Sequence, residues 1–180
     1  MKAKKIVSIL FALTVCALMG WLFYEATRPE ILPVGSDMPA LEYTTPNGNN
    51  VLKPDSAKVT IVVLFHRNCD HCVYQLNQFN VHLQNFTKIK IILLTTDKHF
   101  FNNNAMENWP ALARARNIDW GQVKKDSFRK LFGSVTYPGI YIFDRNGKLG
   151  YKIHGEVKIA KIIKIIQNFG GPERQISGKN

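Results

Sequence analysis

The pattern of hydrophobic and polar positions is clearest in the middle of the chain. The stretch KVTIVVLFH, residues 58–66, is a continuous apolar run rich in β-branched residues, which predicts a buried central strand. Residues 70–86 place apolar side chains at helical spacing, and KIKIILLTT, residues 88–96, predicts a second buried strand. Strand, helix and strand in this order predict two parallel strands joined by a right-handed crossover.

The C-terminal half continues with short elements. Pro110 suits the first turn of a helix that ends near Arg116, and a short helix closed by a glycine is expected over residues 127–132. Residues 135–153 predict two strands joined at an Asn-Gly hairpin, and residues 157–169 predict a final amphipathic helix. The chain is therefore expected to form an α/β domain with a central mixed β-sheet and helices on both faces.

A different pattern precedes this domain. Lys2, Lys4 and Lys5 are followed by residues 6–24, nineteen residues without a charge, which is about the length of a membrane-spanning helix. A cleaved signal peptide is the alternative, but cleavage after Gly20 or Ala26 fits the small-residue rule poorly. A cut after Ala17 fits it better but would leave an apolar stretch in water, which favours an uncleaved anchor. The lysines favour an N-terminus inside, so that the chain beyond Glu25 faces the periplasm or the exterior.

These patterns divide the chain into four parts. Residues 1–24 are expected to form the anchor, 25–33 a proline-containing linker, 34–170 the globular domain and 171–180 a flexible tail. Lys and Arg number 24 against 13 Asp and Glu, and the excess is +8 once the three anchor lysines are left out. An outward-facing domain meets no nucleic acid, so this thinly spread charge favours a membrane surface or acidic partners.

The candidate chemistry is concentrated in LFHRNCDHCVYQL, residues 64–76, where two residues separate a pair of cysteines. Cys69 is expected at the N-terminus of the helix, where free N–H groups and the helix dipole favour a thiolate, so it is the candidate nucleophile. Cys72 lies one turn further along the apolar stripe, which suits a sheltered thiol that resolves a mixed disulfide. Cys16 lies apart from this pair, in the anchor segment.

The spacing of the two cysteines is by itself compatible with two other roles. C-x-x-C is also one half of many zinc sites, although the chain has no second such motif. A structural disulfide is the other alternative, but it would close so short a loop that it would restrict the unfolded chain little. The position between a strand and a helix favours a redox site over both.

The order of strand, C-x-x-C helix, strand, helix, proline-containing turn, hairpin and helix resembles the thioredoxin fold over about residues 34–169. Within it, VGSDMPALEYTTPNGNNVLKPDSAKVTIVVLF and LFGSVTYPGIYIFDRNGKLGYKIHG are similar to the opening and the ending of the membrane-anchored TlpA/ResA/DsbE-like branch, which is related to the AhpC/TSA proteins. The resemblance implies that Pro138 is cis and packs beside the cysteines. It also implies that the backbone of Tyr137 pairs with the substrate chain.

This resemblance also implies an activity and a cellular location. The expected activity is that of a thiol-disulfide oxidoreductase, which exchanges disulfides with protein substrates through its cysteine pair and uses no cofactor and no metal. An electron-transfer partner in the membrane is expected to exchange electrons with it. The catalytic domain is expected on the periplasmic or exterior side of the cytoplasmic (inner) membrane, held there by a single-pass helix.

The sequence departs from this branch close to the cysteines. Relatives usually have Trp before the first cysteine, often Pro before the second and Glu three residues after it, where this chain has Asn68, His71 and Gln75. A buried acidic or amide residue six positions before the first cysteine corresponds to Val63 here. His71 gives the pair the C-x-H-C form of DsbA-type oxidants, so Asp70 and His71 are the residues expected to tune the redox potential.

A metal-binding protein is the rival interpretation. The chain is also similar to the anchored Sco-type copper chaperones of the same fold, with Cys69, Cys72 and a distant histidine as ligands. His154 is the only histidine so placed in the sequence. Thiolate and imidazole suit copper, but proteins of that type separate their cysteines by three residues, and a lone histidine on a strand is more often structural.

Overall fold

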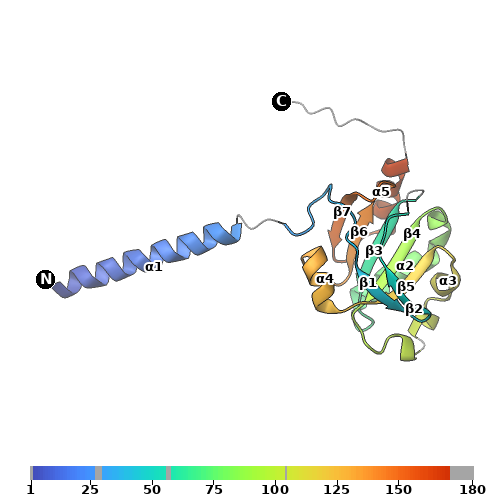
Figure 1. Ribbon diagram of the computed structural model, residues 1–180, viewed down its shortest axis with the longest axis horizontal. Coiled ribbons are helices and arrows are strands. Elements are labelled where there is room, and N and C mark those ends of the chain that lie inside the picture. Colours follow the sequence, from blue (N-terminus) through green and yellow to red (C-terminus); the bar gives the residue numbers. More distant parts are fainter. Residues whose placement is uncertain (1, 27–29, 56–57, 104, 171–180) are drawn as a thin grey trace. The chain divides into compact units, whose positions relative to one another are not determined.

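The computed structural model describes residues 2–26, 30–55, 58–103 and 105–170, and Figure 1 shows its elements. The chain forms two compact units, Met1–Glu30 and Ile31–Asn180. The tail expected over residues 171–180 lies outside the described residues, and so do residues 27–29 of the expected linker.

The first unit contains one helix, α1 (Lys2–Ala26). Its helical conformation agrees with the pattern of residues 6–24, where neither a proline nor a charged residue interrupts the run. Among the described residues, no helix is both long enough and apolar enough to cross a membrane, so the spanning helix expected from the sequence is not found there.

The second unit is built on a seven-stranded sheet with the order β2-β1-β5-β4-β3-β6-β7. Its strands are β1 (Glu42–Thr45), β2 (Gly48–Val51), β3 (Thr60–Phe65), β4 (Lys90–Thr95), β5 (Ile118–Gln122), β6 (Gly139–Phe143) and β7 (Leu149–His154). Its helices are α2 (Asp70–Val81), α3 (Pro110–Arg114), α4 (Lys125–Phe132) and α5 (Ile159–Gly170), with short 3-10 helices at Leu83–Phe86, Phe101–Asn103 and Ala105–Asn108.

β3 is a central strand of this sheet, and all of its residues are buried. It pairs with β4 in parallel and with β6 in antiparallel orientation, which confirms the predicted parallel crossover and the mixed sheet. Val63 in the middle of β3 is fully buried and lies in register with Leu93 and Ile140. The strand that leads into the cysteine pair is therefore held rigidly from both sides.

Helices cover both faces of the sheet, as Figure 1 shows. On one face, Leu76 and Phe79 of α2 and Ile162 of α5 pack in one core cluster with α3 and the strands beneath them. On the other face, Phe128 and Phe132 of α4 form a second cluster with the chain that precedes β1. Successive strand residues point to opposite faces, so the buried strands contribute to both clusters.

The helix predicted over residues 70–86 is shorter than expected. α2 ends at Val81, because His82 has φ −102° and ψ 23° and leaves the α-helical conformation. The chain continues as the 3-10 helix Leu83–Phe86, which keeps Phe86 fully buried with its ring centroid 5.2 Å from that of Phe79. The apolar stripe thus stays in the core although the α-helix has ended.

The domain also begins slightly earlier than the sequence pattern indicates. The second compact unit starts at Ile31, and Leu32 is buried in the cluster beneath α4. The last residues of the expected linker therefore pack as part of the domain, because an apolar side chain in this segment finds a place in the core.

Candidate active site

Cys69 lies where β3 has ended and α2 begins. It is the N-cap residue of α2, its sulfur accepts a hydrogen bond of 3.3 Å from the Cys72 N–H, and its own N–H donates to the His66 carbonyl at 3.1 Å. The side chain is partly exposed. The first N–H groups of a helix have no partner within the helix, and at this position the Cys69 sulfur accepts a hydrogen bond from one of them.

Cys72 lies in the first turn of α2 and is fully buried. Its Sγ is 2.8 Å from the Sγ of Cys69, and both thiols are free. Burial raises the pKa of the Cys72 thiol to about 12, with a further contribution from its hydrogen bond to Cys69. The two sulfurs are therefore unequal: one can meet a partner in solvent, and the other is sheltered and holds its proton.

The turn before β6 forms the opposite wall of the site. The Tyr137–Pro138 peptide bond is cis, as the resemblance implies, and the Tyr137 carbonyl oxygen lies 3.7 Å from the Cys69 sulfur. The Tyr137 hydroxyl is 2.5 Å from Thr96 Oγ1, and its ring packs edge-on against the His66 ring at 5.7 Å. These contacts hold the backbone of Tyr137 next to Cys69.

The two residues between the cysteines are exposed. Asp70 is the first residue of α2, where a carboxylate is favourable to the helix dipole. His71 has a partner that the sequence did not suggest, because its Nδ1 lies 3.0 Å from Glu156 Oε2. Both side chains are exposed, so this pair contributes little to stability but places a carboxylate beside the helix terminus.

The loop between β7 and α5 is a further part of the site that sequence reasoning missed. The Gly155 N–H donates to the Pro138 carbonyl at 2.8 Å, Glu156 contacts His71, and the Val157 N–H donates to Gln75 Oε1 at 2.8 Å. Three successive residues thus join the proline turn to the cysteine helix. In the sequence, the only indication of this loop was a glycine directly after the last strand. This residue, Gly155, has a positive φ of 92°.

A groove of about 570 Å³ is lined by residues on either side of Cys69 in the sequence, Arg67, Asn68 and Val73 among them. Its wall includes Arg67 and Asn68, which directly precede Cys69, and its apolar part includes the buried Trp109. The indole N–H of Trp109 donates to Asn77 Oδ1 at 2.9 Å, which fixes the ring against α2. The groove therefore has an apolar part and a polar rim, and the rim includes the two residues that precede Cys69.

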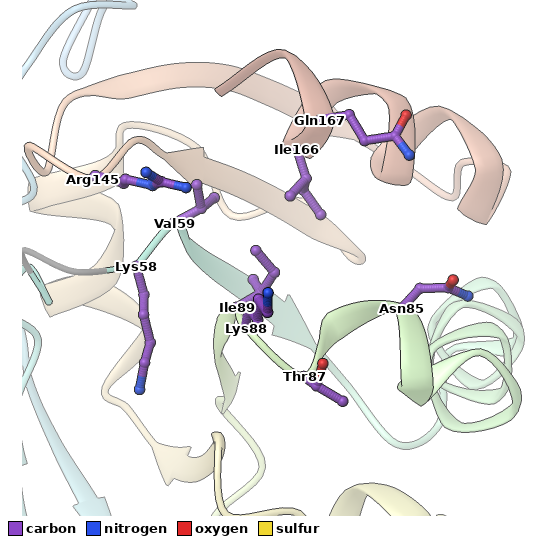
Figure 2. A pocket seen from close by; sticks show the side chains of 9 residues that line it. All are labelled: Lys58, Val59, Asn85, Thr87, Lys88, Ile89, Arg145, Ile166 and Gln167. Carbon is purple, nitrogen blue, oxygen red and sulfur yellow. The ribbon is translucent and has the colours of Figure 1, made fainter. Parts of the chain in front are cut away.

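A second cavity lies away from the cysteines. Figure 2 shows this cavity of about 540 Å³, with Ile166 and Gln167 of α5 above it and Asn85, Thr87, Lys88 and Ile89 below it. Lys58 and Val59 at the start of β3 also line it, whereas Cys69 follows the end of the same strand. The cavity and the thiol pair are therefore at opposite ends of the sheet.

The rival metal site gains no third ligand from the fold. Within the parts of the chain that the structure describes, no three His, Cys, Asp or Glu side chains are grouped so as to hold a metal ion. His154 ends β7, is exposed, and has its ring 6.4 Å from that of Tyr141. The structure thus does not bring it together with the cysteines in such a group.

The raised pKa of Cys72 makes the stability of the reduced protein depend on pH. A thiol with a pKa of 9.0 in the unfolded chain and about 12 in the folded protein holds its proton longer when folded. Its stabilising contribution is complete below the unfolded value and is lost as pH rises toward the folded value. We expect the free energy of unfolding to fall more steeply above about pH 9 in the reduced protein than in Cys72→Ala.

Urea unfolding of both reduced proteins at several pH values measures this difference. Burial also raises the pKa of Tyr43 to about 12 and raises that of Tyr141, but both tyrosines are present in both proteins and cancel in the comparison. Equal slopes for the two proteins would show that the Cys72 thiol does not titrate differently on folding.

Comparisons with known proteins bear on the fold. No family model matches the chain, and no curated protein matches it in sequence. Many solved structures match it, among them a protein assigned as thiol:disulfide interchange protein DsbE from Chlorobium tepidum, with 19% identity and a TM-score of 0.62 over 78% of this chain and 99% of the other. A peroxiredoxin-like protein from Aquifex aeolicus matches with 14% identity and a TM-score of 0.63 over 79% and 90% of the two chains.

A member of the Sco family is also among the matches. BsSco, a member of the Sco family of cytochrome c oxidase assembly proteins, matches with 15% identity and a TM-score of 0.55 over 76% of this chain and 95% of the other. The matching proteins also include a thiol:disulfide interchange protein and a thio-disulfide isomerase. The chain therefore has a thioredoxin-like fold, and its structural neighbours include many thiol-disulfide oxidoreductases of that fold.

Proposed function

We propose that the protein is an extracytoplasmic thiol-disulfide oxidoreductase that exchanges disulfides with protein substrates through Cys69 and Cys72. One observation carries the proposal. A partly exposed sulfur caps a helix 2.8 Å from a buried second sulfur and 3.7 Å from the carbonyl of the residue before a cis proline. This arrangement provides a nucleophile, a resolving thiol and a backbone acceptor in one place.

The proposed reaction has two steps, written here for reduction of a substrate R–S–S–R′. The Cys69 thiolate attacks one substrate sulfur, which forms a Cys69–S–S–R bond and releases R′–S⁻. Cys72 then attacks the Cys69 sulfur, which forms the intramolecular disulfide and releases R–S⁻, and the proton of the Cys72 thiol leaves with the product. The substrate disulfide is reduced, the cysteine pair is oxidised, and the reverse sequence oxidises a substrate dithiol.

Substrate docking is proposed to use the two walls beside Cys69. The backbone at Tyr137, next to the buried Pro138, offers a carbonyl acceptor to an extended substrate chain. The groove lined by Arg67 and Asn68, which directly precede Cys69, provides room for substrate side chains. A membrane protein that exchanges electrons with the pair completes the proposal.

Equilibration of the purified protein with glutathione redox buffers tests the activity itself. The expected result is a reversible mass difference of one disulfide, located at Cys69 and Cys72 by proteolysis, and catalysed exchange with a disulfide-bonded model protein. A protein that forms no such disulfide and accelerates no exchange would rule out the proposed function.

The proposal includes the location of the protein. The uncharged residues 6–24 after three lysines support an N-terminal anchor, with the domain on the periplasmic or exterior side of the cytoplasmic membrane. We expect the full chain to fractionate with membranes and its domain to be cleaved by protease added from outside. A mature protein that starts near Ala26 and is free of the membrane would contradict the anchor.

A copper-binding role is the second candidate, and the proximity of the two sulfurs favours it. Two thiolates this close also suit a soft metal ion such as Cu(I). Titration of the reduced protein with copper separates the two functions. An intense thiolate charge-transfer band and copper that stays bound after desalting would favour the copper chaperone. Weakly bound copper that desalting removes would favour the oxidoreductase.

A further inference from the structure

Gln75 is a polar residue in the core beneath the cysteine pair. Its exposed fraction is 0%, the same as that of Cys72, and it lies three residues further along α2. Side chains three apart on a helix lie on the same face, with Cβ atoms about 5–6 Å apart. The Gln75 and Cys72 side chains are therefore neighbours on the buried face of the helix.

The orientation of this carboxamide is set by its partner. The Val157 N–H donates to Gln75 Oε1 at 2.8 Å, and because an N–H can only donate, the oxygen and not the nitrogen must face it. The amide NH₂ group then points elsewhere, and Nε2 has no hydrogen-bond partner among the residues that the structure describes. A buried donor without an acceptor is costly, so this residue needs an explanation.

The Cys72 sulfur changes its hydrogen-bonding capacity during the proposed reaction. In the reduced structure it is a thiol that donates to the Cys69 sulfur, and a neutral thiol is only a weak acceptor. When Cys72 attacks a mixed disulfide it becomes a thiolate in a buried environment, which is a strong acceptor that water cannot reach easily. A neighbouring donor would then stabilise the attacking form.

We propose that the Gln75 carboxamide donates a hydrogen bond from Nε2 to the Cys72 sulfur when that sulfur becomes a thiolate, and so promotes resolution of the mixed disulfide. The inference rests on the proposed function, in which Cys72 attacks Cys69–S–S–R. The Cys72–Cys69 bond forms, the Cys69–SR bond breaks, and the proton of Cys72 leaves with R–SH. An amide cannot accept this proton, so Gln75 acts as a donor and not as a general base.

The variant Gln75→Met tests the donor, because methionine has a similar length and no polar hydrogen. The test is made in the Cys69→Ser background, where Cys72 is the only cysteine of the pair, and the rate of alkylation of Cys72 is measured against pH. Loss of one hydrogen bond to a charged sulfur should slow alkylation by about tenfold at a given pH. Gln78→Met, a matched change one turn away on the same helix, should leave the rate unchanged.

Gln75→Glu separates the donor from the contact with the loop. Its carboxylate can still accept the Val157 N–H, but it has no hydrogen to donate, so alkylation of Cys72 should again be slow at alkaline pH. The proposal is overturned if Gln75→Met is alkylated at the rate of the Cys69→Ser protein. It is also overturned if Gln75→Glu is alkylated at that rate, because the effect would then come from the contact with the loop and not from the donor. In otherwise wild-type protein, Gln75→Met should lengthen the life of a glutathione mixed disulfide by about tenfold.

Alkylation of Cys72 needs no exchange with a substrate. If the wild-type protein accelerated no disulfide exchange, the proposed function would fail while the alkylation rates could still show the donor. If exchange occurred but alkylation did not depend on Gln75, the inference alone would fail. The two conclusions are therefore tested by different measurements.

Discussion

Cys69→Ser is expected to reduce thiol-disulfide exchange to the uncatalysed background, whereas Cys72→Ser should leave a protein that accumulates long-lived mixed disulfides. The reason is the unequal position of the two sulfurs. Cys69 is partly exposed at the N-cap of α2, while Cys72 is fully buried with a pKa raised by burial to about 12. Only Cys69 can be reached by a substrate sulfur. Only Cys72 is close enough to Cys69 to release the bound substrate from a mixed disulfide.

Mass spectrometry after mixing each reduced variant with a disulfide-bonded peptide measures both outcomes. The Cys16→Ser variant is the matched control, since it makes the same atomic change in α1, which belongs to the other compact unit. It should exchange disulfides at the wild-type rate. If Cys72 were alkylated faster than Cys69 in the reduced protein, the assignment of the nucleophile would be wrong.

The elements that carry strong hydrophobic patterns could be predicted from the sequence. β3 and β4 are continuous apolar runs because both of their faces are buried, and the stripe of α2 repeats at helical spacing because one side of it packs on the sheet. The hairpin of β6 and β7 was predicted from Asn146-Gly147, and Gly147 has the positive φ of 75° that its turn requires. In these places the local sequence and the tertiary structure agree.

The hairpin of β1 and β2 and the strand β5 were not predicted. β2 is short and exposed along its whole length, so it has no hydrophobic pattern. β5 contains Asp119 and Gly121, which interrupt an apolar run. Gly121 is needed there because a Cβ would lie only 2.3 Å from the Tyr43 ring of β1, and this close contact depends on the tertiary packing of two distant segments.

The candidate site, too, could be predicted from the sequence only in part. The cysteine pair is local in sequence and its position on the helix could be predicted, and Gln75 and Val63 were noticed because they differ from a known pattern. The contacts of His71 with Glu156 and of Gln75 with Val157 join residues 85 and 82 positions apart, so no local pattern indicates them. Only the fold shows that the loop before α5 belongs to the site.

The redox potential of the cysteine pair depends on the charges at the start of α2. We expect the His71 side chain and the helix terminus to stabilise the reduced cysteine pair, and a stabilised reduced form makes the disulfide more oxidising. Asp70, the neighbour of Cys69 in the sequence, and Glu156, whose carboxylate lies 3.0 Å from the His71 ring, add negative charge at the start of α2 and oppose this. We therefore expect a potential between the roughly −270 mV of thioredoxin and the roughly −120 mV of DsbA.

His71→Pro should make the potential more reducing by about 30 mV or more, and about 30 mV corresponds to about 1.4 kcal/mol for two electrons. The substitution removes the imidazole without breaking the helix, because proline is tolerated in a first turn. Equilibration with dithiothreitol or glutathione buffers measures the change. His71→Asn is a second variant that removes the imidazole without introducing proline, and it should move the potential in the same direction. A wild-type value below that of thioredoxin, or no downward shift in either variant, would show that other groups near the cysteines set the potential.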